Sequence, residues 1–273
     1  MLKLLLGASG SGKTTLLYQR IRARAEKGEK SILLVPEQFT SSTEGRIYRE
    51  LGDALSGMVE SFSFTSLAEK ILSTEGGAAV QTLSDAGRAV LVRRALEELQ
   101  DNVHYYHRHR RSAAFCQMAA QTIDELKSAG LSGQQLAQLA GACGAESGKL
   151  SELALIFQGY ETLLAGTGMD PSDRLTLAAS RLESALARGG LPEFLRGREV
   201  FIDEFDTFNA PKKRLMGALL ASLPTVTVAL CDDGAPLIPG DMSLFSGAKQ
   251  VAAQLRQLAR KNEAEVAVPE MLL

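Results

Sequence analysis

The pattern of apolar and polar positions divides the chain into three parts. In the first and the last part, short apolar runs alternate with stretches of helical periodicity, which predicts buried parallel strands joined by helices. The middle part has helical periodicity throughout. The predicted strands cover residues 4–6, 31–35, 58–62, 199–202 and 225–230. Ser66 and Glu69 have the spacing of a capping box and predict a helix start. The predicted fold is therefore α/β, with a parallel sheet.

The middle of the chain, residues 81–198, carries apolar positions at helical spacing and no strand signal. Helices are predicted from Ser84 or Asp85 to about residue 100, over 115–126 with Gly130 as the stop, and over 150–164. A fourth begins at Asp170 and Pro171, with the aspartate as N-cap. We therefore predict an all-helical subdomain at 81–198, inserted between a first core part at 1–80 and a second at 199–273.

Residues 7–14 read Gly-Ala-Ser-Gly-Ser-Gly-Lys-Thr, which matches the phosphate-binding pattern GxxxxGKT between a predicted strand and a predicted helix. Glycines allow the loop N–H groups to turn toward an anion, and the helix N-terminus adds positive potential. In this pattern Lys13 reaches the β- and γ-phosphates and the Thr14 hydroxyl binds Mg²⁺. The alternative interpretation is a chance turn before a lysine, but it does not explain why a predicted strand precedes the loop and a predicted helix follows it. The predicted ligands are ATP and Mg²⁺, and the predicted binding residues are Gly7, Ala8, Ser9, Gly10, Ser11, Gly12, Lys13, Thr14 and Thr15.

The apolar strand at 199–202 runs directly into Asp203 and Glu204. In a P-loop ATPase, an aspartate at this place holds Mg²⁺ directly or through water, and a glutamate orients or deprotonates the attacking water. Two surface acids at a strand end are the alternative interpretation, and the P-loop favours the catalytic one. Lys13, Asp203 and Glu204 are therefore the predicted catalytic residues, and Thr14 and Asp203 the predicted metal ligands.

Composition narrows the function classes. The formal net charge of −2 excludes a global basic field, so any nucleic-acid contact must be a local patch. The three cysteines, Cys116, Cys143 and Cys231, follow neither metal nor disulfide spacing, which suits a reducing cytoplasm. No apolar run reaches membrane-spanning length, and the first residues lack the features of a signal peptide.

Residues 104–111, His-Tyr-Tyr-His-Arg-His-Arg-Arg, form a local basic and aromatic cluster with three interpretations. It could be a solvated link between helices. Its arginines (Arg108, Arg110 and Arg111) and rings could bind DNA. His104, His107 and His109 could also ligate a metal.

The order of these motifs resembles the first motor domain of UvrD/Rep-type superfamily I DNA helicases. In order, that domain has a P-loop, a "TxT/QxT"-like turn, a "TFHS"-like turn, a helical insertion and a "DEFQD" segment. In this chain, residues 7–14 stand at the place of the P-loop, 38–40 at the first turn, 61–66 at the second turn and 203–206 at the last segment. Within that group the chain resembles the B subunit of the AddAB-type ATP-dependent helicase/nuclease. Residues 33–40 read LLVPEQFT, and residues 61–68 resemble that family's "SFSxLA" segment with one extra residue.

This resemblance implies a P-loop NTPase (RecA-like) core and a role in double-strand break repair and recombination. It implies a cytoplasmic heterodimer with an A-type helicase/nuclease subunit that acts on DNA, single-stranded or at a duplex end. It also implies that the chain is an N-terminal fragment of a longer protein whose missing C-terminal part carries a nuclease and an iron–sulfur cluster. By position, the implied DNA contacts are Gln38, Phe39, Thr40, Ser63, Phe64 and Thr65, with loop capping as the alternative.

Two departures from motor helicases change what is expected of ATP. The glutamine segment that reads adenine is missing before the P-loop, and residues 206–209 read Asp-Thr-Phe-Asn where motors have Gln-Asp-Thr-Asn. No later arginine-finger motif appears either. We therefore expect a nucleotide- and DNA-binding domain that is not an active motor by itself. The alternative is an active UvrD-like DNA-dependent ATPase; a nucleotide kinase is disfavoured by the missing lid arginines and the large helical insertion.

Overall fold

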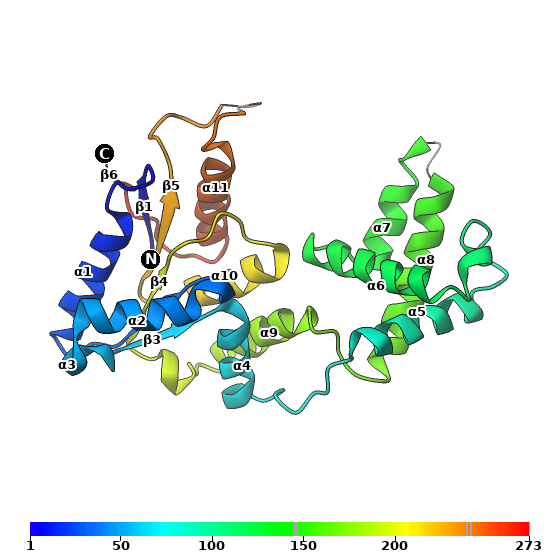
Figure 1. Ribbon diagram of the computed structural model, residues 1–273, viewed down its shortest axis with the longest axis horizontal. Coiled ribbons are helices and arrows are strands. Elements are labelled where there is room, and N and C mark those ends of the chain that lie inside the picture. Colours follow the sequence, from blue (N-terminus) through cyan, green and yellow to red (C-terminus); the bar gives the residue numbers. More distant parts are fainter. Residues whose placement is uncertain (145–146, 239, 241, 273) are drawn as a thin grey trace. The chain divides into compact units, whose positions relative to one another are not determined.

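The computed structural model describes residues 1–144, 147–238, 240 and 242–272 (Figure 1). The chain forms two compact units. The first comprises Met1–Gly77, Leu175–Phe208 and Lys212–Leu273, and the second comprises Ala78–Arg174 with Asn209–Pro211. The helical block predicted at 81–198 is therefore divided, because residues 175–198 belong with the sheet.

The first unit is built on a six-stranded sheet of order β3-β2-β4-β5-β1-β6 in which every pairing is parallel. Its strands are β1 (Leu2–Gly7), β2 (Ser31–Leu34), β3 (Val59–Phe62), β4 (Glu199–Ile202), β5 (Val226–Cys231) and β6 (Glu270–Leu272). The central strands are buried almost throughout, as expected for a sheet covered on both faces. The predicted α/β class with a parallel sheet is confirmed.

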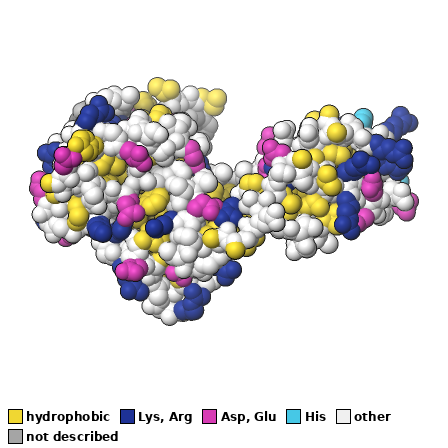
Figure 2. Space-filling view, turned by 60° about the horizontal axis from the view of Figure 1, so that its bottom comes forward, with side chains coloured by type: hydrophobic (Ala, Val, Ile, Leu, Met, Phe, Trp, Pro, Cys, Tyr) yellow, Lys and Arg dark blue, Asp and Glu magenta, His cyan; other side chains and the backbone are white. Residues whose placement is uncertain are grey.

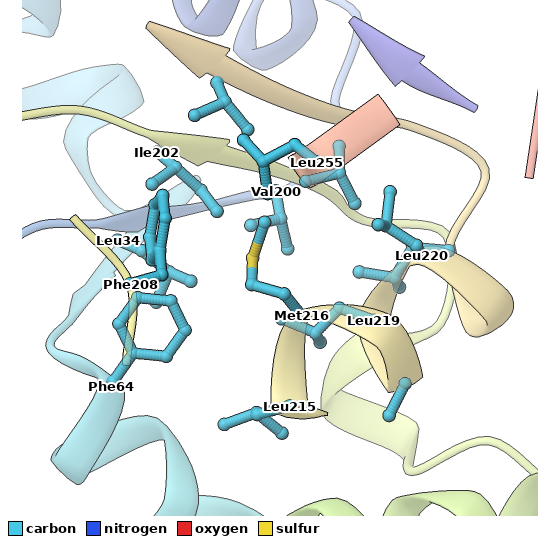
Figure 3. Close-up of a cluster of buried hydrophobic side chains, with 14 of the residues drawn as sticks. Leu34, Phe64, Val200, Ile202, Phe208, Leu215, Met216, Leu219, Leu220 and Leu255 are labelled. Carbon is cyan, nitrogen blue, oxygen red and sulfur yellow. The ribbon is translucent and has the colours of Figure 1, made fainter. Parts of the chain in front are cut away.

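Successive side chains of each strand point to opposite faces, so the continuous apolar runs supply two separate cores. On one face, Leu5 and Phe201 pack with α1 (Lys13–Ala25) and α2 (Thr40–Leu51). On the other, Leu34, Val200 and Ile202 form the cluster drawn in Figure 3. The helices that contribute to this second core are α4 (Phe64–Glu75), α9 (Asp173–Ala187), α10 (Ala210–Ser222) and α11 (Ser246–Lys261). The short elements of this unit are η1 (Glu37–Phe39), α3 (Asp53–Ser56) and η4 (Glu193–Leu195).

Two predicted helix starts differ from the structure. α4 begins at Phe64 with Ser63 as N-cap, and the reciprocal capping box joins Ser63 to Ser66 rather than Ser66 to Glu69. α9 begins at Asp173, not at Asp170. Asp170 is fully buried and paired, so its carboxylate serves the core instead of a helix end.

The second unit contains α5 (Asp85–Glu98), η2 (His107–His109), α6 (Ala113–Ser128), α7 (Gly133–Ala140) and α8 (Ser147–Ala165). Its apolar core includes Val92, Ile123 and Phe157. The spacing of apolar residues in the sequence did not predict α7, which has only eight residues and begins with a capping box between Ser132 and Gln135. Nowhere in the described part of the chain is a helix both long enough and apolar enough to cross a membrane.

A network of buried charges joins the helices of the second unit. The Asp170 carboxylate accepts hydrogen bonds from the Tyr160 hydroxyl and the Lys127 ammonium, and Arg88 Nε lies 3.3 Å from it. Lys127 also pairs with Asp173 at 2.8 Å, and Arg88 pairs with Asp124. Each buried charge here has an opposite charge beside it, as burial requires.

Candidate nucleotide-binding site

The loop between β1 and α1 has the shape of an anion cradle. Gly10 and Gly12 adopt φ of 81° and 91°, a left-handed conformation that side chains other than glycine rarely tolerate. Gly12 is the N-cap of α1 and offers no side-chain cap, so the first N–H groups of the helix are not satisfied by that residue. A phosphate is the natural partner for such a helix end.

Two side chains inside the loop fit a bound phosphate. The buried Lys13 ammonium donates hydrogen bonds to the Gly7 and Ala8 carbonyl oxygens, at 2.8 and 2.7 Å, which holds its charge over the loop. Ser11 Oγ is buried and has no hydrogen-bond partner in the described part of the chain. An unpartnered buried hydroxyl costs free energy, and a ligand oxygen would satisfy it.

Asp203 lies beside this loop because β4 pairs with β2 at the carboxyl edge of the sheet. The Asp203 N–H donates to the Leu34 carbonyl oxygen at 3.1 Å, and the Asp203 carboxylate accepts a hydrogen bond from the Thr14 hydroxyl. The two predicted metal ligands are thus adjacent. Glu204 follows with a φ of 64°, and its N–H donates to Asp203 Oδ1 at 3.0 Å. A non-glycine residue in this region is strained, and such strain concentrates at functional sites.

The electrostatics of the two acids favour a cation. Burial raises the pKa of Asp203, although the Thr14 hydroxyl opposes the rise. Partial burial raises the pKa of Glu204 too, and the neighbouring Asp203 charge adds to the rise. Positive charges on Arg46 and Lys13 lower both pKa values without reversing either shift. A bound Mg²⁺ would favour the ionised carboxylates.

A cavity of about 200 Å³ opens beside these groups and is lined by residues of α1, α2 and the end of β4. Thr14, Asp203 and Glu204 line it together with Tyr18 and Arg46, which sequence reasoning missed. The position of Tyr18, one helical turn after Thr14, was a usable signal. Arg46 carries no comparable signal, because only the fold places α2 here.

The predicted DNA-contacting turns after β2 and β3 lie side by side. The Thr65 hydroxyl donates to Glu37 Oε1 at 2.7 Å, and the Thr40 hydroxyl donates to the Glu37 carbonyl oxygen at 2.8 Å. Gln38 and Phe39 are exposed, and Phe39 also lines the cavity described above.

Two members of the predicted DNA set have structural roles. Phe64 is fully buried, with its ring centroid 5.2 Å from that of Phe205 in an edge-on contact, so it cannot stack a base. The prediction that Phe64 contacts DNA rested on its position in the resembling family, and it was wrong because the Phe64 ring lies in the apolar core. Ser63 is buried and caps α4.

The basic cluster at 104–111 lies in the second unit around η2. The buried Glu152 carboxylate accepts hydrogen bonds from the N–H groups of His104, Tyr105 and Tyr106, which fixes the turn before the arginines. Arg108 and Arg111 are exposed and Arg110 is partly exposed. Figure 2 shows Lys and Arg side chains, with His beside them, gathered at one end of this unit. Among the described residues no group of three or more His, Cys, Asp or Glu side chains could hold a metal ion, so the metal interpretation of His104, His107 and His109 is dropped.

Comparisons with known proteins give a consistent family assignment. The family model described as "ADDB, N-terminal" matches residues 4–272. The chain is 34% identical to the B-type subunit of the ATP-dependent helicase/deoxyribonuclease of Desulforudis audaxviator, over 98% of the chain and 23% of that protein. The proteins of the same name from Moorella thermoacetica and Clostridium perfringens are 34% and 29% identical, over 94% and 95% of the chain and 23% and 22% of their own length. The chain thus spans about a quarter of the length of these relatives.

Proposed function

The chain belongs to the ADDB N-terminal family, and from this membership we propose that it is the nucleotide- and DNA-binding domain of a B-type helicase/nuclease subunit. The parent complex would be an ATP-dependent deoxyribonuclease of the cytoplasm, acting on DNA ends in double-strand break repair and recombination. Its other half would be an A-type helicase/nuclease subunit. An iron–sulfur cluster would belong to a part of the parent protein outside this chain.

The observation that carries nucleotide binding is the convergence of an uncapped helix end, the Lys13 ammonium and an unpartnered Ser11 hydroxyl around one loop. Residues 7–15 would surround the phosphates, with Lys13 near the β- and γ-phosphates. Thr14 and Asp203, already joined by a hydrogen bond, would hold Mg²⁺, and the metal would neutralise the phosphate charge.

Glu204 would hold a water, but the chain lacks the partners that an active motor has around that residue. Its strained backbone aims it from the end of β4 into the same cavity as Thr14 and Asp203. Its raised pKa suits a group that accepts a proton from water. Motors add a glutamine here, and this chain has Asp206 and Thr207. We therefore propose nucleotide binding with slow turnover, so that this chain alone has little enzymatic activity.

DNA binding is proposed at two places. Gln38, Phe39, Thr40 and Thr65, with Ser63 beneath them, would contact a single strand at the carboxyl edge of the sheet, with short hydroxyls on phosphate and the Phe39 ring on a base. Arg108, Arg110 and Arg111 in the second unit would contact phosphates.

Titration with fluorescent ATP in the presence of Mg²⁺, followed by phosphate release with and without single-stranded DNA, tests the nucleotide proposal. We expect binding with slow, DNA-independent turnover. Lys13→Ala should weaken binding about 10- to 100-fold, since it removes a charged donor, whereas the exposed Lys27→Ala should not. Intact binding in Lys13→Ala would refute the site, and robust DNA-stimulated turnover would favour the active-motor alternative.

Salt dependence of DNA affinity tests the basic cluster. Replacing Arg108, Arg110 and Arg111 with alanine should make the slope of log affinity against log salt shallower by about 2 for single-stranded DNA. Arg93→Ala with Arg94→Ala, which removes two exposed arginines that pair with Glu97 and Glu98, is the control. An unchanged slope in the triple variant contradicts the contact.

A further inference from the structure

One cation in the nucleotide cavity has no role in the P-loop pattern. Arg46 lies on α2, half-buried, next to the inward-facing Ile47. α2 starts just after β2, and β2 pairs with β4 directly before Asp203. The same cavity is lined by Arg46, Thr14 and Glu204, which come from three different segments. Arg46 thus reaches the site through the fold rather than through a sequence motif.

The Arg46 guanidinium is held by an aromatic ring and not by a carboxylate. Its central carbon lies 4.9 Å from the ring centroid of Tyr18, which is one helical turn after Thr14 on α1. Stacking on a ring face engages the guanidinium plane and leaves its five N–H donors at the edges. In the described part of the chain, Arg46 makes no hydrogen bond or ion pair that would occupy these donors.

The position of Arg46 along the site corresponds to the far end of a nucleoside triphosphate. Loop N–H groups of a P-loop hold the α- and β-phosphates, and the threonine-bound metal bridges the β- and γ-phosphates. The terminal phosphate would therefore extend past Thr14 and Asp203, toward Glu204. Arg46 lines the same cavity as Thr14 and Glu204, and its charge acts on both acids there.

We propose that Arg46 binds the terminal phosphate and makes this site prefer a nucleoside triphosphate over a diphosphate. This inference rests on the proposed nucleotide binding and names a recognition residue within it. A planar guanidinium can hold phosphate oxygens with two parallel N–H donors.

The competing explanation gives Arg46 a local role only. It would balance the charges of Asp203 and Glu204 and pack against Tyr18. Burial raises the pKa of Tyr18 to about 12 even though the Arg46 charge opposes the rise. In that case removal of Arg46 changes the affinities for triphosphate and diphosphate by the same factor. The ratio of the two affinities therefore separates the explanations.

The experiment measures dissociation constants of the full 273-residue chain for a non-hydrolysable ATP analogue and for ADP, both with Mg²⁺, by isothermal titration calorimetry. For Arg46→Ala we expect the analogue to bind about 10- to 100-fold more weakly and ADP less than about threefold more weakly. Arg46→Lys keeps the charge and should recover part of the preference. The exposed Arg22→Ala, which removes the same charge outside the cavity, should change neither constant.

The outcomes distinguish this inference from the proposal it rests on. If the unchanged chain binds neither nucleotide, nucleotide binding itself fails, and if Lys13→Ala binds both as well as the unchanged chain, the assignment of the site to the P-loop fails. If the unchanged chain binds both and Arg46→Ala keeps its ratio of affinities, only the role of Arg46 is overturned. Circular dichroism identifies a variant that fails to fold. Should Arg46→Ala fail to fold, Arg46→Lys decides, and an unchanged ratio in that variant overturns the role.

Discussion

Each of the two units buries an aspartate, Asp170 in the second unit and Asp203 in the first, and the two carboxylates have opposite surroundings. In the second unit, Asp170 is surrounded by Arg88, Lys127 and the Tyr160 hydroxyl. At the nucleotide site, Asp203 and Glu204 are adjacent, and the Lys13 ammonium is bonded to carbonyl oxygens rather than to either acid. In the first arrangement the buried carboxylate is neutralised by cations of the chain itself, although Arg88 Nε makes an ion pair there without a hydrogen bond. The second is left short of positive charge, which is the condition a metal–phosphate ligand would satisfy.

The pKa shifts express the same difference. Hydrogen bonds to Asp170 and Asp173 raise the pKa of Lys127 against the effect of its burial, so the cation is kept charged by its partners. At the nucleotide site, burial raises the pKa of both acids, and the neighbouring Asp203 charge adds to the rise at Glu204. Buried charges with internal partners hold helices together, and those without them indicate where something binds.

The largest effect should come from breaking the paired network. Arg88→Met leaves the buried Asp170 and the partly exposed Asp124 without one cation, and removal of one member of a buried ion pair costs about 3–5 kcal/mol of unfolding free energy. Urea unfolding followed by helical circular dichroism measures the loss. Below denaturing concentrations, ATP affinity should remain as in the unchanged chain. A loss of about 1 kcal/mol or less, the value of an exposed ion pair, would contradict the network's role.

Asp203→Asn should weaken ATP binding without lowering stability, the opposite of what is expected for Arg88→Met. The amide keeps the shape and can still accept from Thr14, but it removes a desolvated charge and a metal ligand. We expect Mg²⁺-dependent ATP affinity to fall about 10- to 100-fold, while the free energy of unfolding stays equal or rises. Calorimetric titration and urea unfolding of the same sample measure both. Destabilisation would show that Asp203 is a structural residue like Asp170.

A matched pair of hydroxyl deletions sharpens the contrast. Tyr160→Phe removes a donor to the buried Asp170 and should lower the free energy of unfolding by about 1–3 kcal/mol, without effect on ATP affinity. Ser11→Ala removes a buried hydroxyl that has no partner in the described chain, so stability should not fall and ATP affinity should weaken. The comparison fails if both variants lose stability equally.

The smallest effect is a pH dependence. Because the folded pKa of Asp203 is raised, the folded chain takes up this proton at a higher pH than the unfolded chain, and stability from this group falls as pH rises through that window. The stability advantage of Asp203→Asn over the unchanged chain should therefore be largest at neutral pH and shrink as the solution is acidified. Urea unfolding across a pH series measures it, and a pH-independent difference would contradict the shift.

Local patterns predicted much of the fold because they act over a few residues. The apolar runs predicted β2 and β4, and helical spacing predicted α5 from Ser84 or Asp85 to about residue 100, close to its observed bounds of Asp85 and Glu98. Where local signals competed, prediction failed. Ser63 and Ser66 can each cap a helix, and burial of Phe64 decided between them. Asp170 has N-cap chemistry, but it is surrounded by Arg88 and Lys127 from distant segments.

The candidate site shows the same division. By itself the sequence determined the strand–loop–helix pattern, Lys13, Thr14 and the acids Asp203 and Glu204, since phosphate chemistry requires those residue types at short spacing. Only the tertiary structure decided that α2 brings Arg46 over Tyr18 into the cavity. Parallel strands order their carboxyl ends at one edge, and the helices that follow them supply side chains whose meeting no local pattern encodes.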